Sequence, residues 1–359
     1  MHEVARILCR YAIGSTLACI GITKTATAAD SVTLYGVVDT FLTHVNADGK
    51  GAANRMDSSG LYASRFGLKG HEDLGSGYGA NFVLENGFNA NDGSAADSNR
   101  LFNRQAWVGV GGPWGELRFG RQNTPQWVMN GNFDAFSAAT QASGWNNMFS
   151  PPPRADNAAT YISPIVGGFK VQAMYARGAT GGSAIADQVA SNQNIHIGAE
   201  YASGPLYVGL NYEEVRNAAA GNKSRRTAGA VSYSFTDALK AYLAVAKQTV
   251  SDHSQDNYLY STSFLYAFSP AASLALGYTF FQDHASGAGH GNASEAGILY
   301  RYSLSKRTVL YGAYSYLSQQ GNQHSFVLGG AAVVEPSARI ASTPGGNING
   351  AQVGIVHLF

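Results

Sequence analysis

Apolar and polar positions alternate along most of this chain, in short segments that end at glycine-rich or polar turns. In the segment 169–175, for example, Phe, Val, Ala and Tyr alternate with Lys, Gln and Met. A period of two is that of a β-strand with one apolar face and one mixed face. The pattern predicts sixteen strands, near residues 32–43, 61–71, 78–89, 101–112, 115–122, 156–164, 168–177, 193–203, 205–215, 224–235, 238–248, 257–268, 271–282, 294–304, 307–318 and 349–359.

The connections between these segments alternate between short and long. Tight turns are expected at 72–77, 112–114, 166–168, 204–205, 236–237, 269–270 and 305–306, and longer polar loops at 44–60, 90–99, 178–192 and 284–293. Short turns at one end and long loops at the other are typical of an outer-membrane barrel. No apolar run after Ile22 is long enough for a spanning helix. We therefore predict an all-β fold, a sixteen-stranded antiparallel transmembrane β-barrel in one domain.

Two connections are much longer than the rest, at 123–155 and 319–348. Loops of this length are usually functional or flexible. The first has almost no charge and is rich in small and aromatic residues, namely Trp127, Phe133, Phe136, Trp145 and Phe149. This composition does not suit a solvated surface loop, so we expect the segment to pack onto another part of the protein.

The N-terminal residues 1–29 have the order of a secretory signal peptide. Arg6 and Arg10 precede an apolar run over 11–22, and small residues follow it. We expect cleavage after Ala29, with Ala28 as the alternative, and export through the Sec pathway. The barrel domain then comprises residues 30–359.

Cysteine content and charge exclude several classes of protein. Both cysteines, Cys9 and Cys19, fall in the leader, so the mature chain has no disulfide and no thiolate metal ligand. The whole chain has 24 Lys and Arg against 23 Asp and Glu, which argues against a nucleic-acid partner. The histidines of the mature chain lie mostly in or beside loops, and no nucleophile motif accompanies them. We expect no enzymatic activity, no cofactor and no metal site.

Several motifs of the chain resemble those of known outer-membrane channels. They are the segments 31–39, 64–75, 103–109, 119–122, 154–157, 161–164, 304–308 and 354–359. In their order and spacing they resemble the general, non-specific trimeric porins of Gram-negative bacteria, of the Neisseria and Burkholderia type. The resemblance implies a sixteen-stranded homotrimeric barrel in the bacterial outer membrane, through which small hydrophilic solutes and ions diffuse passively. It also implies that the third loop, about 123–155 here, folds inward and narrows the pore.

The resemblance assigns the basic wall of the pore constriction to Arg65, Arg104 and Arg154. Alternation supports Arg65, which shares a polar face with Lys69. By alternation we also expect Arg104 to point inward, on the face that includes Ala106. An Arg on the lipid side costs about 2–4 kcal/mol at the bilayer midplane, which favours the lumen for these side chains.

Further charged residues of the barrel wall follow from the same alternation. In the fifth strand Glu116 and Arg118 are expected on the inner face, where Arg118 would add to the basic wall. Arg121 is then expected on the outer face, where a subunit contact is one interpretation. Asp39 is expected to face the lumen, and pairing with a neighbouring base is the alternative.

Asp134 is the only charged residue between Asn123 and Pro153 of the long first loop. The resemblance implies that acidic side chains of this loop face the basic wall across the pore. One aspartate against several arginines predicts a narrow and net positive constriction that favours anions. The alternative for Asp134 is that it caps a short helix within the loop.

The last strand ends in a regular pattern that has a function of its own. Ile355, His357 and Phe359 lie on one face, with an aromatic residue at the chain end. This pattern resembles the signal that the barrel-assembly machinery recognises. The resemblance to porins also implies outer-membrane lipid and lipopolysaccharide as partners.

Two alternative functions remain open at this point. A substrate-specific channel for a sugar or an organic acid would use an aromatic path, for which Trp127, Phe133, Phe136 and Trp145 are candidates. We favour core packing of the loop for these rings. A non-conducting adhesin or anchor barrel is the second alternative.

Overall fold

The computed structural model describes residues 31–149, 151–177, 193–217, 221–285, 291–320, 326–329 and 342–359. The expected leader, the loop 178–192 and most of the loop 319–348 lie outside these residues. The strands are β1 Ser31–Ala47, β2 Gly51–Ser58, β3 Arg65–Gly75, β4 Tyr78–Gly87, β5 Gln105–Gly112, β6 Gly115–Asn123, β7 Arg154–Ile162, β8 Phe169–Arg177, β9 Gln193–Ser203, β10 Leu206–Asn217, β11 Asn222–Ser234, β12 Leu239–Val250, β13 Asp256–Ala267, β14 Ala272–Asp283, β15 Ala293–Ser303, β16 Thr308–Gln319 and β17 Ile348–Leu358. Two helices, α1 Pro125–Asn132 and α2 Gly144–Met148, lie between β6 and β7.

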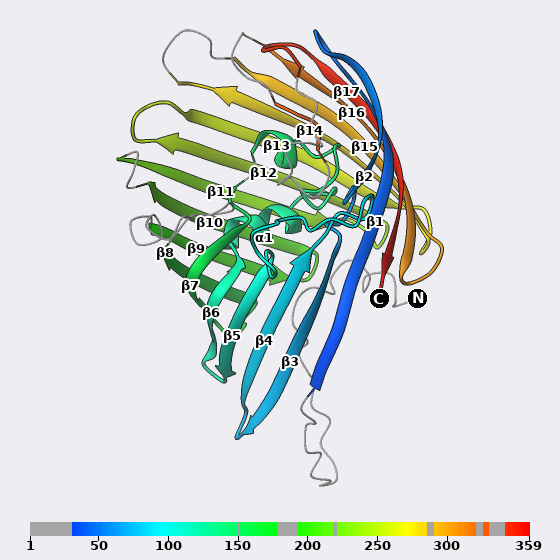
Figure 1. Cartoon of the computed structure of the whole chain (residues 1–359). Coiled ribbons are helices and arrows are strands. Elements are labelled where there is room, and N and C mark those ends of the chain that lie inside the picture. Colours follow the sequence, from blue (N-terminus) through cyan, green and yellow to red (C-terminus); the bar gives the residue numbers. More distant parts are fainter. Residues whose placement is uncertain are drawn as a thin grey trace.

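The strands form one closed antiparallel sheet (Figure 1). From β3 onward each strand pairs with its neighbours in the chain, and β17 pairs with β1 to close the ring. The turn between β3 and β4 shows why the strands reverse so sharply. Ser76 and Gly77 both have positive φ, 54° and 80°, which matches the twist of a two-residue hairpin.

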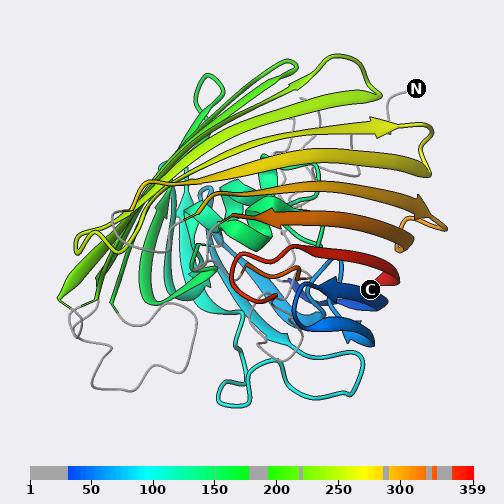
Figure 2. The ribbon, with the colours of Figure 1, turned by 90° about the horizontal axis from the view of Figure 1, so that it is seen from above.

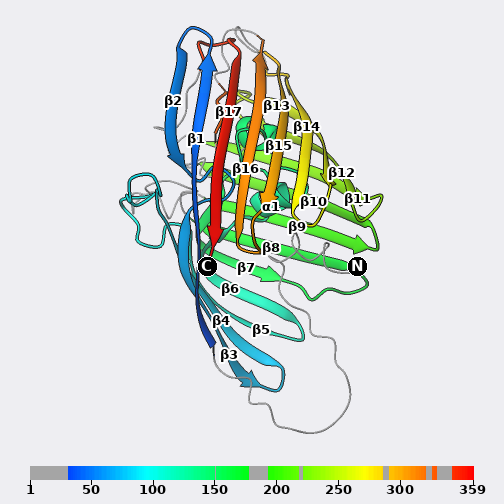
Figure 3. The same cartoon turned by 90° about the vertical axis from the view of Figure 1, so that its right-hand side faces the viewer.

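The second strand of the barrel is broken in two. β1 pairs with β3 over 31–37 and with β2 over 40–47, so β2 and β3 occupy the same side of β1 in succession. Figure 3 shows β2 continuing beside the upper half of β1. Counting β2 and β3 as one strand confirms the predicted barrel of sixteen strands. The predicted loop over 44–60 is wrong, because β1 extends through Ala47 and a short turn leads directly into β2.

The bend between β2 and β3 is held by Asp39 of β1. The backbone N–H groups of Leu61 and Tyr62 each donate to Asp39 Oδ2 at 2.7 Å, and the Tyr311 hydroxyl donates to Oδ1 at 2.6 Å. Asp39 is completely buried. It lies on the inward face of β1, as expected, but its carboxylate fixes the bend and is not exposed to the lumen.

The two faces of the sheet differ as a membrane barrel requires. On the outer face Leu210, Leu243 and Phe264 are 60%, 56% and 47% exposed. The residues next to each of them along the strand point into the barrel and are buried. An exposed band of apolar side chains suits contact with lipid. No helix within the described ranges is long and apolar enough to span a membrane.

Aromatic side chains lie near strand ends on the outer face, where outer-membrane barrels carry aromatic girdles. Tyr266, Phe268, Tyr300 and Tyr302 are exposed on the outer face, near strand ends. Trp107 differs, because it is only 8% exposed and faces the lumen.

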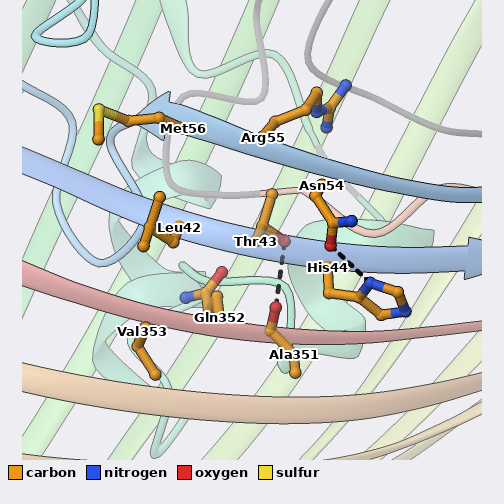
Figure 4. Close-up of a pocket in the computed structure, with 9 residues that line it drawn as sticks. All are labelled: Leu42, Thr43, His44, Asn54, Arg55, Met56, Ala351, Gln352 and Val353. Atoms are coloured by element: carbon orange, nitrogen blue, oxygen red, sulfur yellow. Dashed lines mark hydrogen bonds between the residues drawn. The ribbon is translucent and has the colours of Figure 1, made fainter.

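A shallow groove crosses the outer surface of β17, β1 and β2 (Figure 4). Exposed Leu42, Met56 and Val353 form its apolar lining. His44 Nδ1 and Asn54 Oδ1 lie 2.7 Å apart within it. Since these side chains point away from the barrel interior, the groove is separate from the channel.

Candidate channel constriction

The segment between β6 and β7 contains both helices of the described chain. α1 begins after Thr124, whose hydroxyl accepts a hydrogen bond from Trp127 N, and Pro125 occupies its first turn. α2 begins after Ser143, which caps Asn146 N in the same way. Side-chain caps and an N-terminal proline are standard helix starts. Asp134 caps neither helix.

This loop packs against the inner face of the barrel, and Figure 2 shows its helices enclosed by strands. The rings of Phe133 and Tyr207 of β10 stack with centroids 4.6 Å apart. Ala135 N donates to Ser263 Oγ of β13 at 3.0 Å, and Arg301 Nη2 of β15 donates to Ala135 O at 3.2 Å. Stacking and hydrogen bonds thus hold the loop against the wall formed by β10 to β15.

Glu295 of β15 provides a further anchor for this loop. Asn147 Nδ2 of α2 donates to both of its carboxylate oxygens, at 3.0 and 2.9 Å. Glu295 is buried inside the barrel. The bidentate contact fixes α2 to the wall, and nothing in the local pattern of β15 indicated it.

Two wall glycines allow the loop to approach this closely. A Cβ at Gly277 of β14 would overlap the ring of Phe136, and one at Gly297 of β15 would overlap the carbonyl oxygen of Ala142. Any larger side chain at either position would displace the loop toward the opposite wall.

The aromatic residues of the loop are buried in this contact. Phe133, Phe136 and Trp145 are 1%, 2% and 1% exposed, and Trp127 is half-buried. Core packing therefore accounts for the three buried rings. They are not available as a path of stacking surfaces for a sugar.

The structure places Asp134 differently from the expectation. Its carboxylate accepts hydrogen bonds from Ser143 Oγ at 2.6 Å, from Ala138 N at 3.0 Å and from Ser263 Oγ at 3.3 Å. The side chain is buried, and burial raises the pKa of its carboxyl, against the lowering influence of these hydrogen bonds. Asp134 is thus turned toward β13 and joins the loop to that strand.

The predicted wall arginines gather around a glutamate that alternation did not single out. Nε of Arg104 lies 2.7 Å from Glu85 Oε1, and Nε of Arg65 lies 3.3 Å from Oε2. The Tyr35 hydroxyl donates to Oε2 at 3.0 Å. Arg154, the first residue of β7, is buried at 6% exposed, and its charge acts at longer range on Glu85, on both other arginines and on Arg121. We call Arg65, Arg104, Arg154 and Glu85 the arginine cluster.

The inward direction of Glu85 follows from the register of the strands. Its partner on β3 is Gly67, which shares the face of Arg65, whereas the neighbouring Phe66 and Leu68 are exposed outside. Two guanidinium groups contact this one carboxylate, and with the charge of Arg154 they leave an excess of positive charge on this wall. The signal for Glu85 in the sequence was a lone acid within an otherwise uncharged strand.

Strand alternation does not explain the inward direction of the Arg104 side chain. Arg104 precedes β5, and the inward face of β5 carries Gln105 and Trp107, whereas Val108 is 56% exposed outside. The prediction that Arg104 shares an inward face of the strand with Ala106 is therefore wrong, because Ala106 lies on the outward face with Val108. Arg104 turns inward because it lies outside the strand and is drawn to Glu85.

The other predicted lumen residues lie on the inner face of β3 and β6. Arg118 Nη2 lies 2.6 Å from Glu116 Oε2, and its guanidinium lies 4.3 Å from the centre of the Trp107 ring. Lys69 Nζ lies 5.6 Å from the centre of the Tyr35 ring. These are cation–π distances. Arg118 is thus held near the wall by two neighbours and stands apart from the arginine cluster.

Arg121 has partners within its own chain. Its Nε donates to Asn103 O at 2.7 Å, and its guanidinium contacts Asp156, which also pairs with Arg100 at 2.9 Å. A subunit contact is therefore not needed to explain an arginine at this outer position.

The chain end has the expected alternation. Ile355, His357 and Phe359 are exposed on the outer face of β17, and Gln352 and Val356 are buried inside. Phe359 N and Gly36 O form a backbone hydrogen bond of 3.1 Å, so the last residue is tied to β1.

The chemistry of the channel is that of fixed charges. Within the described ranges, no group of three His, Cys, Asp or Glu side chains is arranged to hold a metal ion. The inner wall instead offers guanidinium donors on one side and a packed loop on the other. Such an arrangement can select ions by charge and size as they pass.

Comparison with known proteins identifies a matching family and several similar proteins. A family model described as Gram-negative porin matches residues 14–322. Outer membrane porin protein 32 of Delftia acidovorans is 29% identical over 96% of this chain and 98% of its own length. An outer membrane porin protein of Bordetella pertussis is 35% identical over 64% of this chain and 67% of its own.

A solved structure has the same fold. The anion-selective porin from Comamonas acidovorans superposes with a TM-score of 0.75 and 28% identity, over 92% of this chain and all of that chain.

Proposed function

This chain is a member of the Gram-negative porin family, and from that premise we propose that its arginine cluster gives an outer-membrane diffusion channel a preference for anions. The channel admits small hydrophilic solutes and ions, which pass between the arginine cluster and the inward-packed loop. The observation that carries the anion preference is the placement of charge. The loop's one acid, Asp134, is turned toward β13, so it does not offset the three arginines.

A similar protein supports the same choice, since the Comamonas porin is described as anion-selective. Buried rings in the loop disfavour the alternative of a channel with an aromatic sugar path. The proposal extends to assembly: three copies form the native protein, surrounded by outer-membrane lipid. The exposed face of Ile355, His357 and Phe359 serves as the signal for the barrel-assembly machinery.

The test is a reversal potential measured across a planar bilayer in a KCl gradient. The wild-type channel should prefer chloride, and the double variant Arg65→Ala and Arg154→Ala should lose that preference by about fivefold or more. A pair of charges at contact distance is worth about 1 kcal/mol in water, and each 1.4 kcal/mol corresponds to tenfold. Lys306→Ala, in the turn between β15 and β16, is the matched control and should behave like the wild type.

The result that would overturn the proposal is cation preference of the wild-type channel, or a double variant with unchanged selectivity. Absence of any single-channel step from correctly folded protein would instead favour the anchor-barrel alternative. Liposome swelling that saturates with one solute would favour a substrate-specific channel.

A further inference from the structure

A group of cations lies on the outer face of the barrel, near the ends of β10, β11 and β12. Arg216 is paired with Lys223, Glu214 with Arg225, and Thr227 with Lys247 in adjacent strands. Directly paired residues point to the same side of a sheet. These positions share the face of Leu210, which is 60% exposed on the outside. We call Arg216, Lys223, Arg225 and Lys247 the outer rim patch.

The outer rim patch lies at the boundary of the apolar band. Tyr212 and Leu210 precede Glu214 by two and four residues on the same face of β10. On β12, Val245 precedes Lys247 by two residues on this face and is 47% exposed. The patch is at the end of the barrel that carries the long loops, which in outer-membrane barrels is the extracellular end. It therefore sits at the level of the lipid headgroups in the outer leaflet.

One carboxylate orders the two arginines of the patch. Arg216 Nε lies 3.0 Å from Glu214 Oε1, and Arg225 Nε lies 2.9 Å from Oε2. The side chain of Glu214 is 10% exposed, whereas those of Arg216 and Arg225 are 46% and 50% exposed. Glu214 thus lies beneath two guanidinium groups that it holds side by side. The Tyr212 hydroxyl also donates to this carboxylate, at 3.2 Å.

Lys247 extends the patch onto β12. Its Nζ lies 4.7 Å from the centre of the Tyr258 ring and 3.5 Å from Asp256 Oδ1. Asp252, in the adjacent turn, accepts a hydrogen bond from Asn222. Even with these acids counted, the four cations leave the patch with excess positive charge.

We propose that the outer rim patch binds the phosphate groups of lipopolysaccharide in the outer leaflet. Arginine presents a planar fork of donors that matches the oxygens of a phosphate. Because Glu214 already holds both guanidinium groups, less side-chain entropy is lost when a phosphate binds. The acyl chains of the same molecule would then lie along the apolar band below, on Leu210 and Val245.

The experiment measures binding of a bisphosphorylated deep-rough lipopolysaccharide, and of the same molecule after enzymatic dephosphorylation, to the full-length protein in detergent. The wild-type protein should bind the phosphorylated form about tenfold more tightly, since each Arg near an anionic surface contributes about 1 kcal/mol. The double variant Arg216→Gln and Arg225→Gln should lose this difference. Its affinity for the dephosphorylated form should be unchanged.

The matched control is the double variant Lys306→Gln and Arg307→Gln, which removes two cations from the opposite end of the barrel and should bind as the wild type does. An unheated gel shows that each variant is folded, and unchanged channel selectivity separates this site from the arginine cluster. Equal wild-type affinity for both lipopolysaccharides would overturn the proposal, whether or not the variants fold. So would equal losses in the patch and control variants, or a patch variant whose main change is in oligomeric state.

Discussion

At the scale of single residues, selectivity depends on which acids face the channel. Glu85 sits among the arginines and contacts two of them directly, at 2.7 and 3.3 Å. The carboxylate of Asp134 accepts hydrogen bonds from two residues of the loop and from Ser263 of β13. The two acids therefore differ in their effect on a passing ion, although both lie inside the barrel.

The corresponding prediction compares Glu85→Gln with Asp134→Asn. Glu85→Gln removes the one carboxylate of the arginine cluster, so the preference for chloride over potassium should rise by about twofold or more. Asp134→Asn should leave the preference within experimental error, because this carboxylate is turned away from the channel. Reversal potentials of both variants in one salt gradient provide the comparison. A larger shift for Asp134→Asn than for Glu85→Gln would contradict this placement of the charges.

At the scale of elements, the width of the channel depends on how firmly the loop is held. The loop contacts β10, β13, β14 and β15 through rings, hydrogen bonds and two wall glycines. Glu295 is the anchor that a single substitution tests best, because it accepts two hydrogen bonds from one asparagine.

Glu295→Ala should loosen α2 without unfolding the barrel. The change removes two of the three acceptors of the half-buried Asn147 amide and leaves only Gln141 O, at a cost of about 1–3 kcal/mol to the docked loop. Single-channel recordings should then show larger current fluctuations and more frequent partial closures than the wild type. Glu72→Ala, at an exposed position near the β3–β4 turn, is the control. Steady wild-type currents from Glu295→Ala would mean that the other contacts suffice to hold the loop.

At the scale of the whole molecule, fixed charges in a water-filled barrel act through a field that salt screens. The screening length falls from about 10 Å at 0.1 M salt to about 3 Å at 1 M. The ratio of chloride to potassium permeability should therefore decrease several-fold between these concentrations, measured with the same concentration ratio across the bilayer. A ratio that stays constant would show that ions are selected by close binding and not by the field.

The number of strands, their faces and the membrane band follow from local patterning, because side-chain direction alternates along any strand. Arg65 and the exposed face of Ile355, His357 and Phe359 were predictable for this reason. Residues outside a strand escape that rule, and Arg104 turned inward although its alternation argument was wrong. The break at 59–64 was hidden as well, since it depends on a carboxylate twenty residues earlier in the chain, at Asp39.

The sixteen-stranded barrel could thus be inferred from the alternation of residues alone, whereas the basic wall of the channel was assigned by the resemblance to porins. The register of β3, β4 and β5 brings Glu85 next to two arginines, and packing of the loop on the wall turns Asp134 toward β13. Alternation shows that a lone acid such as Glu85 is unusual in its strand, but it does not show the partners of either acid. The outer rim patch was not predictable from the sequence either, because its cations come from three strands whose register sets them side by side. Periodicity is a property of each strand, whereas the partners of a charge are set by which strands meet and in what register.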